Sequence, residues 1–375
     1  MRTPFCPHFG LCGGCATQHL PYEVQLENKK IRLIQEIGYK NVQVFSGDEF
    51  GYRNRMDFIF HPSGLGNREK GKWWRWVDIE KCLISNDRLN EIIAEIRRFF
   101  GTEIDAFDLK NHGGTFRYAV IRTPQKDSSV SFVLNKASSR LDAAIEQVKR
   151  FAAQSDVKNV LITYMPPDSD RSVGEEFFVV KGSDTLEETF LGKTFRYSAQ
   201  GFFQNNSPMA EKMHEYVNGL LLKYDTKYAH LLDLYGGVGT FGIINSGLFK
   251  SVTTLESFEG CTLAAKENIK LNNAANVEAV CLDAAQLKKL DFPKPLYVVN
   301  DPPRSGMHAK TIKRLNELAP HVIIYISCNV KQLGLELKKF KDYKIRSAAI
   351  FDLFPQTNHM ESVIELIRSA PPSEK

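Results

Sequence analysis

The sequence lacks any long uninterrupted hydrophobic run. No stretch approaches the ~18 apolar residues of a membrane-spanning helix, and the opening MRTPFCPHFG lacks the apolar core of a signal peptide. Internal repeats and low-complexity segments are also missing. We therefore expect a soluble, monomeric protein of the cytoplasm with no membrane partner.

Charge of one sign is not in large excess either. The chain has 49 Lys and Arg against 44 Asp and Glu, so its formal net charge is only +5. This mildly basic balance is compatible with an acidic partner such as RNA but does not require one. With 375 residues, of which 43% are hydrophobic, the chain can build two or three domains with cores of their own.

Three regions of the chain differ in their patterns. Residues 1–44 hold a cysteine cluster followed by an amphipathic stretch of helical spacing. Residues 45–194 are rich in strand-like runs with helical segments around 87–100 and 140–152, so we expect an α+β domain built on antiparallel strands. Residues 195–370 alternate short apolar runs with helical segments, which is typical of an α/β, mainly parallel, doubly wound sheet. The last two runs, IRSAAIFDLF and SVIELIR, are predicted to form an antiparallel hairpin at its edge.

A glycine-rich turn follows the first strand expected in the C-terminal region. The segment LLDLYGGVGTFG closes this strand at Asp233 and turns into a helix, and its glycines let the backbone pass close to a ligand. Dinucleotide-binding enzymes share such a turn, but two later acids favour S-adenosylmethionine. Glu256 ends the second strand, where it can accept hydrogen bonds from both ribose hydroxyls, and Asp283 ends the third, near the adenine amino group. In the alternative interpretation, either acid simply caps a helix.

The fourth and fifth strands bring further polar residues to the same edge. DPPRSG places Asp301 and Arg304 on either side of two prolines that stiffen the loop. IIYISCNV ends the fifth strand at Cys328, and FPQTNHMES brings His359 and Glu361 back to the sheet. A cysteine at a strand end is usually a small buried hydrophobe, but its place at a ligand-binding edge favours a nucleophile. Both His359 and Glu361 can act as a base, and Glu361 is the better candidate.

Four of the seven cysteines fall within the first 82 residues. Cys6, Cys12 and Cys15 follow a C-x5-C-x2-C spacing, and Cys82 lies further on in EKCLI. In a reducing compartment this clustering predicts a metal site rather than disulfides. Four thiolates suit either a tetrahedral zinc ion or an iron–sulfur cluster, and the spacing alone favours zinc.

All three tryptophans of the chain lie in NREKGKWWRW, at residues 67–76. The basic side chains of this segment can contact phosphates while its aromatic faces stack on unpaired bases. A β-hairpin with a packed face explains the pattern equally well, because large alternating residues also suit strands. The segment therefore predicts either an RNA contact or a structural hairpin. Arg53 and Arg55 are further candidates for phosphate contacts.

Over nearly its whole length the chain resembles the RNA 5-methyluridine (uracil-C5) methyltransferase family. The resemblance rests on the order and spacing of the N-terminal cysteines, YRNRMDF, GFFQNN, LDLYGGVGTF, DPPRSG, SCN and HMES. It implies a class I, Rossmann-like methyltransferase domain that binds S-adenosylmethionine, preceded by a central α+β RNA-binding domain and an N-terminal iron–sulfur segment.

The resemblance also assigns roles to individual residues. It implies that Cys328 is the nucleophile and that Glu361 is the base. The residues expected to contact the cofactor are Gln204, Tyr235, Gly236, Thr240, Glu256, Asp283 and Asp301. The cysteines at positions 6, 12, 15 and 82 are expected to hold a [4Fe–4S] cluster, which reverses the preference for zinc.

The chemistry of uracil explains why such an enzyme needs both a thiol and a base. C5 of uracil is a weak nucleophile, but a thiolate added to C6 turns the ring into an enolate whose C5 can accept a methyl group. A base must then remove the C5 proton so that the thiolate leaves and the ring becomes aromatic again. The thiolate is the reactive form, so Cys328 must be deprotonated when substrate binds.

The substrate is less defined by the sequence than the chemistry. Many family members carry a small β-barrel RNA-binding domain ahead of the cysteines, whereas this sequence starts at the cysteines. It therefore resembles the shorter members, and we expect 23S ribosomal RNA as the substrate, with the T-loop uridine of transfer RNA as the alternative. Two other classes fit less well. A nucleotide-binding oxidoreductase leaves DPPR and SCN without a role, and a non-catalytic RNA-binding iron–sulfur protein leaves Cys328 and Glu361 unexplained.

Overall fold

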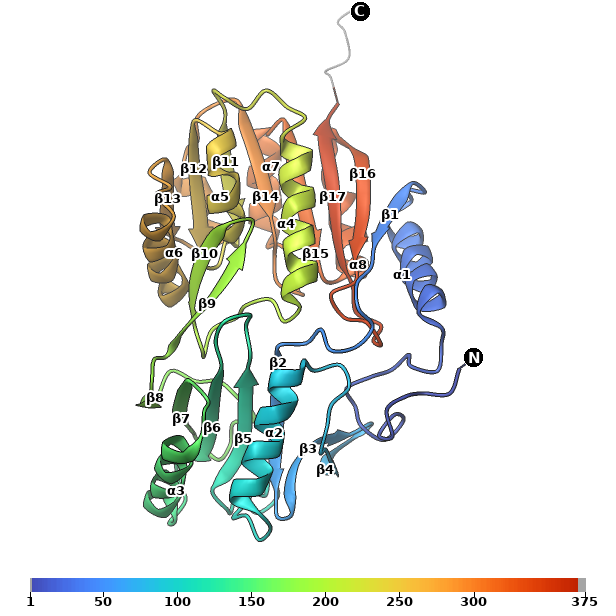
Figure 1. Cartoon of the computed structure of the whole chain (residues 1–375). Coiled ribbons are helices and arrows are strands. Elements are labelled where there is room, and N and C mark those ends of the chain that lie inside the picture. Colours follow the sequence, from blue (N-terminus) through green and yellow to red (C-terminus); the bar gives the residue numbers. More distant parts are fainter. Residues whose placement is uncertain (1, 370–375) are drawn as a thin grey trace, which may run out of the picture.

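Two β-sheets organise the computed structural model, which describes residues 2–369 (Figure 1). The eight-stranded sheet fills the upper half of Figure 1 and the seven-stranded sheet the lower half. Residue 370, the last of the predicted C-terminal region, lies outside the described residues. Among the helices of residues 2–369, none combines the length and the apolar character that a membrane crossing needs.

The central region forms the seven-stranded sheet, in the order β4-β3-β2-β5-β6-β7-β8. Its strands are β2 (Arg55–His61), β3 (Gly64–Glu69), β4 (Lys72–Asp78), β5 (Phe116–Arg122), β6 (Ser129–Asn135), β7 (Asn159–Met165) and β8 (Phe177–Lys181). The predicted antiparallel arrangement is confirmed for every neighbouring pair except β6 and β7, which are parallel. For that pair the prediction was wrong, because a crossover helix rather than a hairpin connects the two strands.

Two helices cover one face of this sheet, α2 (Asp87–Phe100) and α3 (Leu141–Gln154), as the sequence predicts. Helix α2 begins where the Asn86 side chain accepts a hydrogen bond of 2.9 Å from the Leu89 N–H. The apolar residues of both helices recur at helical spacing and pack into one core with alternate residues of β2, β5, β6 and β7. This core holds β2 and β3 in place, and both strands contribute residues to the cavity described below.

The eight-stranded sheet has the order β1-β16-β17-β15-β14-β11-β12-β13. Its strands are β1 (Val42–Phe45), β11 (His230–Leu234), β12 (Ser251–Glu256), β13 (Val277–Cys281), β14 (Leu296–Asn300), β15 (Val322–Ser327), β16 (Tyr343–Phe351) and β17 (Glu361–Arg368). The five parallel strands expected from the sequence are confirmed. The predicted β16–β17 hairpin also forms, but β1 pairs in parallel with β16 and takes the edge position that was predicted for the hairpin.

Helices bury both faces of this sheet. The helical elements here are α1 (Tyr22–Ile37), α4 (Ser207–Leu221), α5 (Thr240–Asn245), η1 (Ser246–Leu248), α6 (Glu259–Leu271), η2 (Ala284–Lys289), α7 (Ala309–Leu318) and α8 (Val330–Leu337). Tyr297 and Val299 of β14 pack in the core with α4 and α5, whereas Leu296 and Val298 pack in the core with α1, α7 and α8. The strands are therefore apolar on both sides, and polar residues concentrate where the strands end.

A hairpin of β9 (Thr185–Phe190) and β10 (Lys193–Ser198) lies between the two sheets in Figure 1. Phe190, Phe195 and Tyr197 insert into the core on the α4 side of the eight-stranded sheet. The hairpin thus spans residue 194, at which the sequence predicts the central region to end. The segment GFFQNN begins at Gly201, shortly after β10 ends at Ser198, and leads into α4.

Candidate active site

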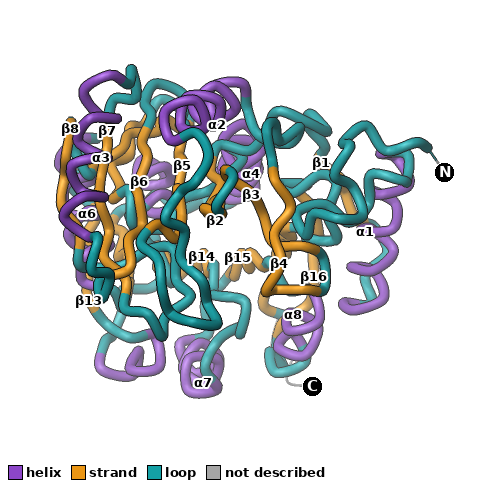
Figure 2. Tube along the Cα trace, turned by 90° about the horizontal axis from the view of Figure 1, so that it is seen from below, coloured by secondary structure: helices purple, strands orange, loops and turns teal. Residues whose placement is uncertain are grey.

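A cavity of about 560 Å³ lies where the ends of the parallel strands meet the seven-stranded sheet. In the view of Figure 2, β2 and β3 project next to β14 and β15, and Met56 of β2 and Arg68 of β3 line the cavity. The lining of the cavity includes Cys328, Glu361 and Gln204, three of the residues that the sequence predicts to be functional. Other parts of the chain complete the wall with Gly13, Gly14, Arg53, Met56, Asn67, Arg68, Ile84, Phe202, Asn205, Arg304, Phe354, Thr357 and His359.

Strand pairing brings Cys328 and Glu361 together from different parts of the chain. β15 and β17 are antiparallel neighbours, and Ser327 pairs with Ser362 at the end of the ladder. The Ser362 hydroxyl also donates a hydrogen bond of 3.1 Å to the Ser327 carbonyl. One residue further on, Cys328 follows β15 and Glu361 begins β17, and both residues line the cavity. The thiol and the carboxyl group are therefore placed by rigid elements at one wall of the cavity.

The electrostatics of this wall oppose the simultaneous ionisation of its acids. Burial raises the pKa of Cys328 to about 11, and the carboxylates of Glu361 and Asp301 act in the same direction. Burial, together with Asp301, also raises the pKa of Glu361 well above its ordinary value, and only 7% of that residue is exposed. Charging one group makes the next harder to charge, so the three acids titrate as a coupled set.

Arg304 is the cation that offsets this repulsion, since it lowers the pKa of both Cys328 and Glu361. Its loop is fixed because the Asn329 side chain donates a hydrogen bond of 2.9 Å to the Arg304 carbonyl. The Arg304 guanidinium lies 3.4 Å from His359 Nδ1, and the pKa of His359 is lowered by burial and by Arg304. A guanidinium can only donate, so His359 accepts at Nδ1 and is neutral.

The glycine turn after β11 has the tight geometry that the sequence predicts. Tyr235 takes a positive φ of 58°, and Gly237 and Gly239 also have positive φ angles. At Gly236, a Cβ atom would lie 2.4 Å from Thr254 Cγ2, so only glycine fits. Behind the turn, buried Asp233 accepts a hydrogen bond of 2.9 Å from the Gly242 N–H. Thr240 is the first residue of α5 at the end of this turn.

Glu256 faces the glycine turn from the end of the neighbouring strand. Its Oε2 accepts a hydrogen bond of 3.2 Å from the Gly237 N–H, while Oε1 accepts from the backbone of Ser257 and Phe258 at 2.7 and 2.8 Å. Asp283 accepts a hydrogen bond of 2.8 Å from the Ala285 N–H and so has the capping role that was the alternative for it. Both acids still lie at the strand ends where a nucleoside would bind, and the charge of Asp283 acts on Tyr235.

Asp301 lies between the glycine turn and the wall of the cavity that holds Cys328 and Glu361. Its N–H donates to the Leu234 carbonyl at 3.3 Å, which ties the start of the DPPR loop to the end of β11. Burial alone raises the pKa of its carboxyl group to about 7. No hydrogen bond from another part of residues 2–369 compensates this carboxyl group, so it can receive one from a ligand. These residues fit a bound S-adenosylmethionine at the turn.

The four N-terminal cysteines gather but do not form a site for a single metal ion. Cys6, Cys12, Cys15 and Cys82 line one small cavity of about 30 Å³. Burial, with a smaller contribution from the neighbouring thiols, raises the pKa of Cys15 to about 12. Within residues 2–369, no group of three or more His, Cys, Asp and Glu side chains could hold a metal ion. The structure therefore does not show the metal site that the sequence analysis predicted.

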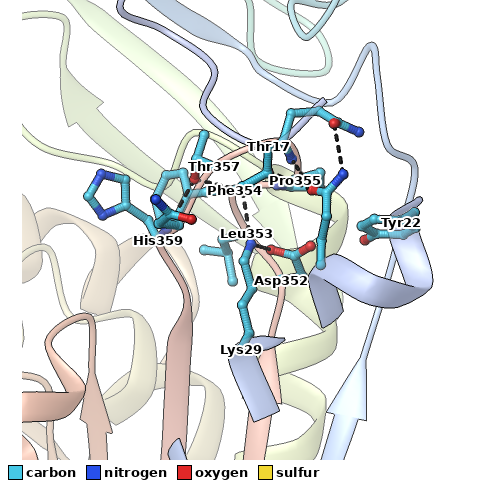
Figure 3. Close-up of polar contacts among 12 residues, drawn as sticks. Thr17, Tyr22, Lys29, Asp352, Leu353, Phe354, Pro355, Thr357 and His359 are labelled. Carbon is cyan, nitrogen blue, oxygen red and sulfur yellow. Dashed lines mark hydrogen bonds and ion pairs between the residues drawn. The ribbon is translucent and has the colours of Figure 1, made fainter. Parts of the chain in front are cut away.

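A buried polar network, which the sequence analysis missed, supports the loop that leads to Glu361 (Figure 3). Lys29 of α1 donates to Asp352 Oδ1 at 2.6 Å and to the Phe354 carbonyl at 3.2 Å, and both side chains of the ion pair are almost fully buried. The fully buried Gln356 accepts at its carbonyl from the Ala16 and Thr17 N–H groups. No local motif reveals these contacts, because more than 300 residues of sequence separate their partners.

Relatives of the chain are known along most of its length. A family profile described as tRNA (Uracil-5-)-methyltransferase matches residues 21–369. The chain is 33% identical to the tRNA (uracil(54)-C(5))-methyltransferase of Pyrococcus abyssi, over 97% of this chain and 86% of that protein. It is also 33% identical to an uncharacterised RNA methyltransferase of Caldanaerobacter subterraneus, over 96% of this chain and 85% of that protein.

The fold is also that of a solved structure. The crystal structure of Pyrococcus abyssi tRNA (uracil-54, C5)-methyltransferase in complex with S-adenosyl-L-homocysteine matches this chain with a TM-score of 0.80 and 31% identity. The match covers 95% of this chain and 86% of that one. The expected α/β methyltransferase fold is thereby confirmed.

Proposed function

Since the chain belongs to the tRNA (uracil-5-)-methyltransferase family and is an S-adenosylmethionine-dependent RNA (uracil-C5)-methyltransferase, we propose that it methylates C5 of uridine 54 in transfer RNA. In this proposal Cys328 is the nucleophile and Glu361 the base. One observation carries the proposal: the two residues lie at the same end of the β15–β17 ladder and line one cavity, together with Gln204.

The cavity supports a reaction in which the chain's own residues form and break one covalent bond. Cys328 and Glu361 first lose their protons to solvent, which Arg304 favours. The Cys328 thiolate then adds to C6 of the uracil, and the electron pair of the C5=C6 bond moves to C5 and O4. S-adenosylmethionine supplies the electrophilic methyl group, which C5 takes up. Glu361 then accepts the C5 proton, the C5=C6 double bond returns, and the thiolate leaves. Both groups then return to their reactive form: the Cys328 thiolate has been released from C6, and the Glu361 carboxyl group loses its proton to solvent.

Two roles follow from the charges at the cavity wall. Arg304 stabilises the thiolate and the Glu361 carboxylate, since it lowers the pKa of both groups. In the resting site the protons on Cys328, Glu361 and Asp301 prevent three adjacent negative charges. Asp301 lies beside both the base site and the glycine turn. It is therefore proposed to contact the cofactor, together with Gln204, Tyr235, Gly236, Thr240, Glu256 and Asp283.

The choice of transfer RNA departs from the expectation of 23S ribosomal RNA. Relatives from Pyrococcus abyssi and Pyrococcus horikoshii, 33% and 34% identical to this chain, are named as enzymes that act on uridine 54 of transfer RNA. The expectation of ribosomal RNA rested on the point at which the sequence begins, which carries no information about the RNA that the central sheet contacts. The relatives therefore support the alternative.

The substrate proposal is tested by methylation with labelled S-adenosylmethionine. Unmodified transfer RNA transcript and protein-free 23S ribosomal RNA are offered separately, and the product is mapped. We expect label as 5-methyluridine at position 54 of the transfer RNA, and a transcript with cytidine at that position serves as the control. Label in 23S ribosomal RNA alone would keep the chemistry and overturn the substrate.

We also propose that Cys6, Cys12, Cys15 and Cys82 hold a [4Fe–4S] cluster. Their lining of one cavity supports this. In a four-iron cluster each thiolate binds a different iron, so the thiols need not converge on one point as they do around zinc. Protein purified without oxygen should contain about four iron and four sulfide per chain. Cys82→Ser should lower both contents, Cys281→Ser should not, and zinc in place of iron would contradict the proposal.

A further inference from the structure

The tryptophan-rich segment forms a hairpin at the edge of the seven-stranded sheet, but it does not bury its aromatic side chains. β3 and β4 are paired, and β4 is the edge strand. Trp73, Trp74 and Trp76 remain 57%, 45% and 50% exposed. A hairpin with a packed aromatic face would bury these side chains, because each offers a large apolar area. The structural role that the sequence allowed therefore does not account for them.

The hairpin holds the three indole rings in fixed positions relative to one another. A register shift between Arg68 and Glu69 pushes the start of β4 out of the regular ladder. Trp73 and Trp74 are perpendicular to each other with their ring centres 5.8 Å apart, and Trp76 stacks on buried His61 at 5.7 Å. Arg68 donates to the Trp73 carbonyl and so holds the bulged segment. Rigid exposed rings lose little entropy when a planar ligand stacks on them.

The hairpin is continuous with the catalytic cavity. The tryptophans line a second cavity of about 300 Å³, and Arg68 lines both this cavity and the one that contains Cys328 and Glu361. An extended ligand that fills the catalytic cavity can therefore continue past Arg68 onto the tryptophans.

The charges around the three indole rings favour the binding of a polyanion. The segment from residue 67 to 76 carries four basic side chains and one acidic one, Glu69, which pairs with Lys72 at 2.6 Å and Arg75 at 3.2 Å. Lys70 at the turn and Lys110 across the cavity are exposed. Asp108 on the same wall is engaged within its own loop, where it accepts from the Lys110 N–H at 2.8 Å. Exposed rings among such cations match unpaired nucleotides, in which bases and phosphates alternate.

We propose that the β3–β4 hairpin is a stacking surface for the unpaired bases next to the target uridine. This inference rests on the proposed function. A uridine that enters the catalytic cavity leaves its stack, so its neighbours lose a stacking partner and gain one from the indole rings. Lys70, exposed at the turn of the hairpin, can contact the phosphates, whereas Arg68, which lines both cavities, is paired with Asp170 at 2.7 Å.

Tryptophan fluorescence of the unaltered enzyme tests this proposal, because all three tryptophans of the chain lie in the hairpin. Unmodified transfer RNA should quench the emission, whereas inorganic polyphosphate, which has charges but no bases, should not. In labelled-methyl assays, Trp73→Ala, Trp74→Ala or Trp76→Ala should raise the KM for RNA roughly 5- to 150-fold for a stacked base and leave kcat unchanged. The matching Trp→Phe variants should recover most of the loss.

Tyr228→Ala is the control, because Tyr228 is 69% exposed on the loop before β11, away from the hairpin. Circular dichroism shows whether each variant is folded. If the wild type methylates RNA while the alanine variants keep its KM and RNA leaves the fluorescence unchanged, the hairpin proposal is wrong and the proposed function stands. Quenching by polyphosphate alone would also overturn stacking. If the wild type methylates no RNA, the proposed function itself has failed.

Discussion

Replacement of Cys328 by alanine should abolish methylation. Without the thiolate, C5 of the uracil stays a weak nucleophile, and we expect kcat to fall by at least about 10⁴-fold, as for other enzymes that lose their nucleophile. RNA binding should persist, because the other walls of the cavity are unchanged. The rate of label transfer from S-adenosylmethionine to transfer RNA measures the loss, and a gel-shift assay measures binding.

The matched control for this variant is Cys261→Ala. Cys261 is a free cysteine of α6 that lies outside the lining of the catalytic cavity. This variant should retain wild-type turnover. Substantial methylation by Cys328→Ala would show that another group attacks the ring, and the assignment of the nucleophile would have to be abandoned.

Glu361→Gln should have a different effect, because it removes the base and keeps the nucleophile. The buried carboxyl group has a pKa well above its ordinary value, so a neutral amide of similar size resembles its resting state. When it is ionised, the Glu361 carboxylate raises the pKa of Cys328; glutamine cannot ionise, so the thiolate can form without that repulsion. We therefore expect the adduct to form and to accept its methyl group. Its release should be slowed by about 10²- to 10⁴-fold, because a base no longer removes the C5 proton.

The expected product of this variant is a methylated RNA held on the protein, which a denaturing gel separates from free RNA. Turnover should stop after about one methyl group per enzyme, since each molecule stays trapped. His359→Gln is the comparison, because His359 is the other base that the sequence allowed and it lines the same cavity. If His359→Gln traps the adduct and Glu361→Gln turns over normally, the base is His359.

The parts of the site that the sequence predicted share a physical origin. Strand ends are readable from short apolar runs, and the carboxyl ends of parallel strands meet at one edge. The sequence alone therefore predicts that the glycine turn, Glu256, DPPR and Cys328 lie near one another. The antiparallel pairing of β16 and β17 could be inferred because the runs IRSAAIFDLF and SVIELIR are close in the sequence. This pairing brings Glu361 to the end of the sheet where Cys328 lies.

Other features could not be predicted because they depend on contacts between distant residues. The sequence around residue 42 gives no sign that β1 joins β16, about 300 residues later in the chain. Lys29 occupies a polar position of an amphipathic helix, where the usual expectation is a solvated charge, yet it is buried against Asp352. Gln356 likewise lies in what reads as a turn and is fully buried with a positive φ of 68°.

The tryptophan segment shows a third kind of limit. Its alternating large residues fit a hairpin, and the hairpin forms, but the pattern cannot tell which rings the rest of the protein covers. The side chains left exposed depend on the edge position of β4 and on the shift in its pairing with β3. Exposure, which decides between a structural and a binding role, is a property of the assembled sheet.

The most direct test of the account is covalent trapping with transfer RNA that contains 5-fluorouridine at position 54, in the presence of S-adenosylmethionine. Fluorine at C5 cannot be removed as a proton, so the adduct formed with the nucleophile should persist. We expect a complex that survives denaturation, with a methylated fluorouridine attached to the peptide that contains Cys328. A complex attached to another residue, or methyl transfer without any covalent complex, would contradict it.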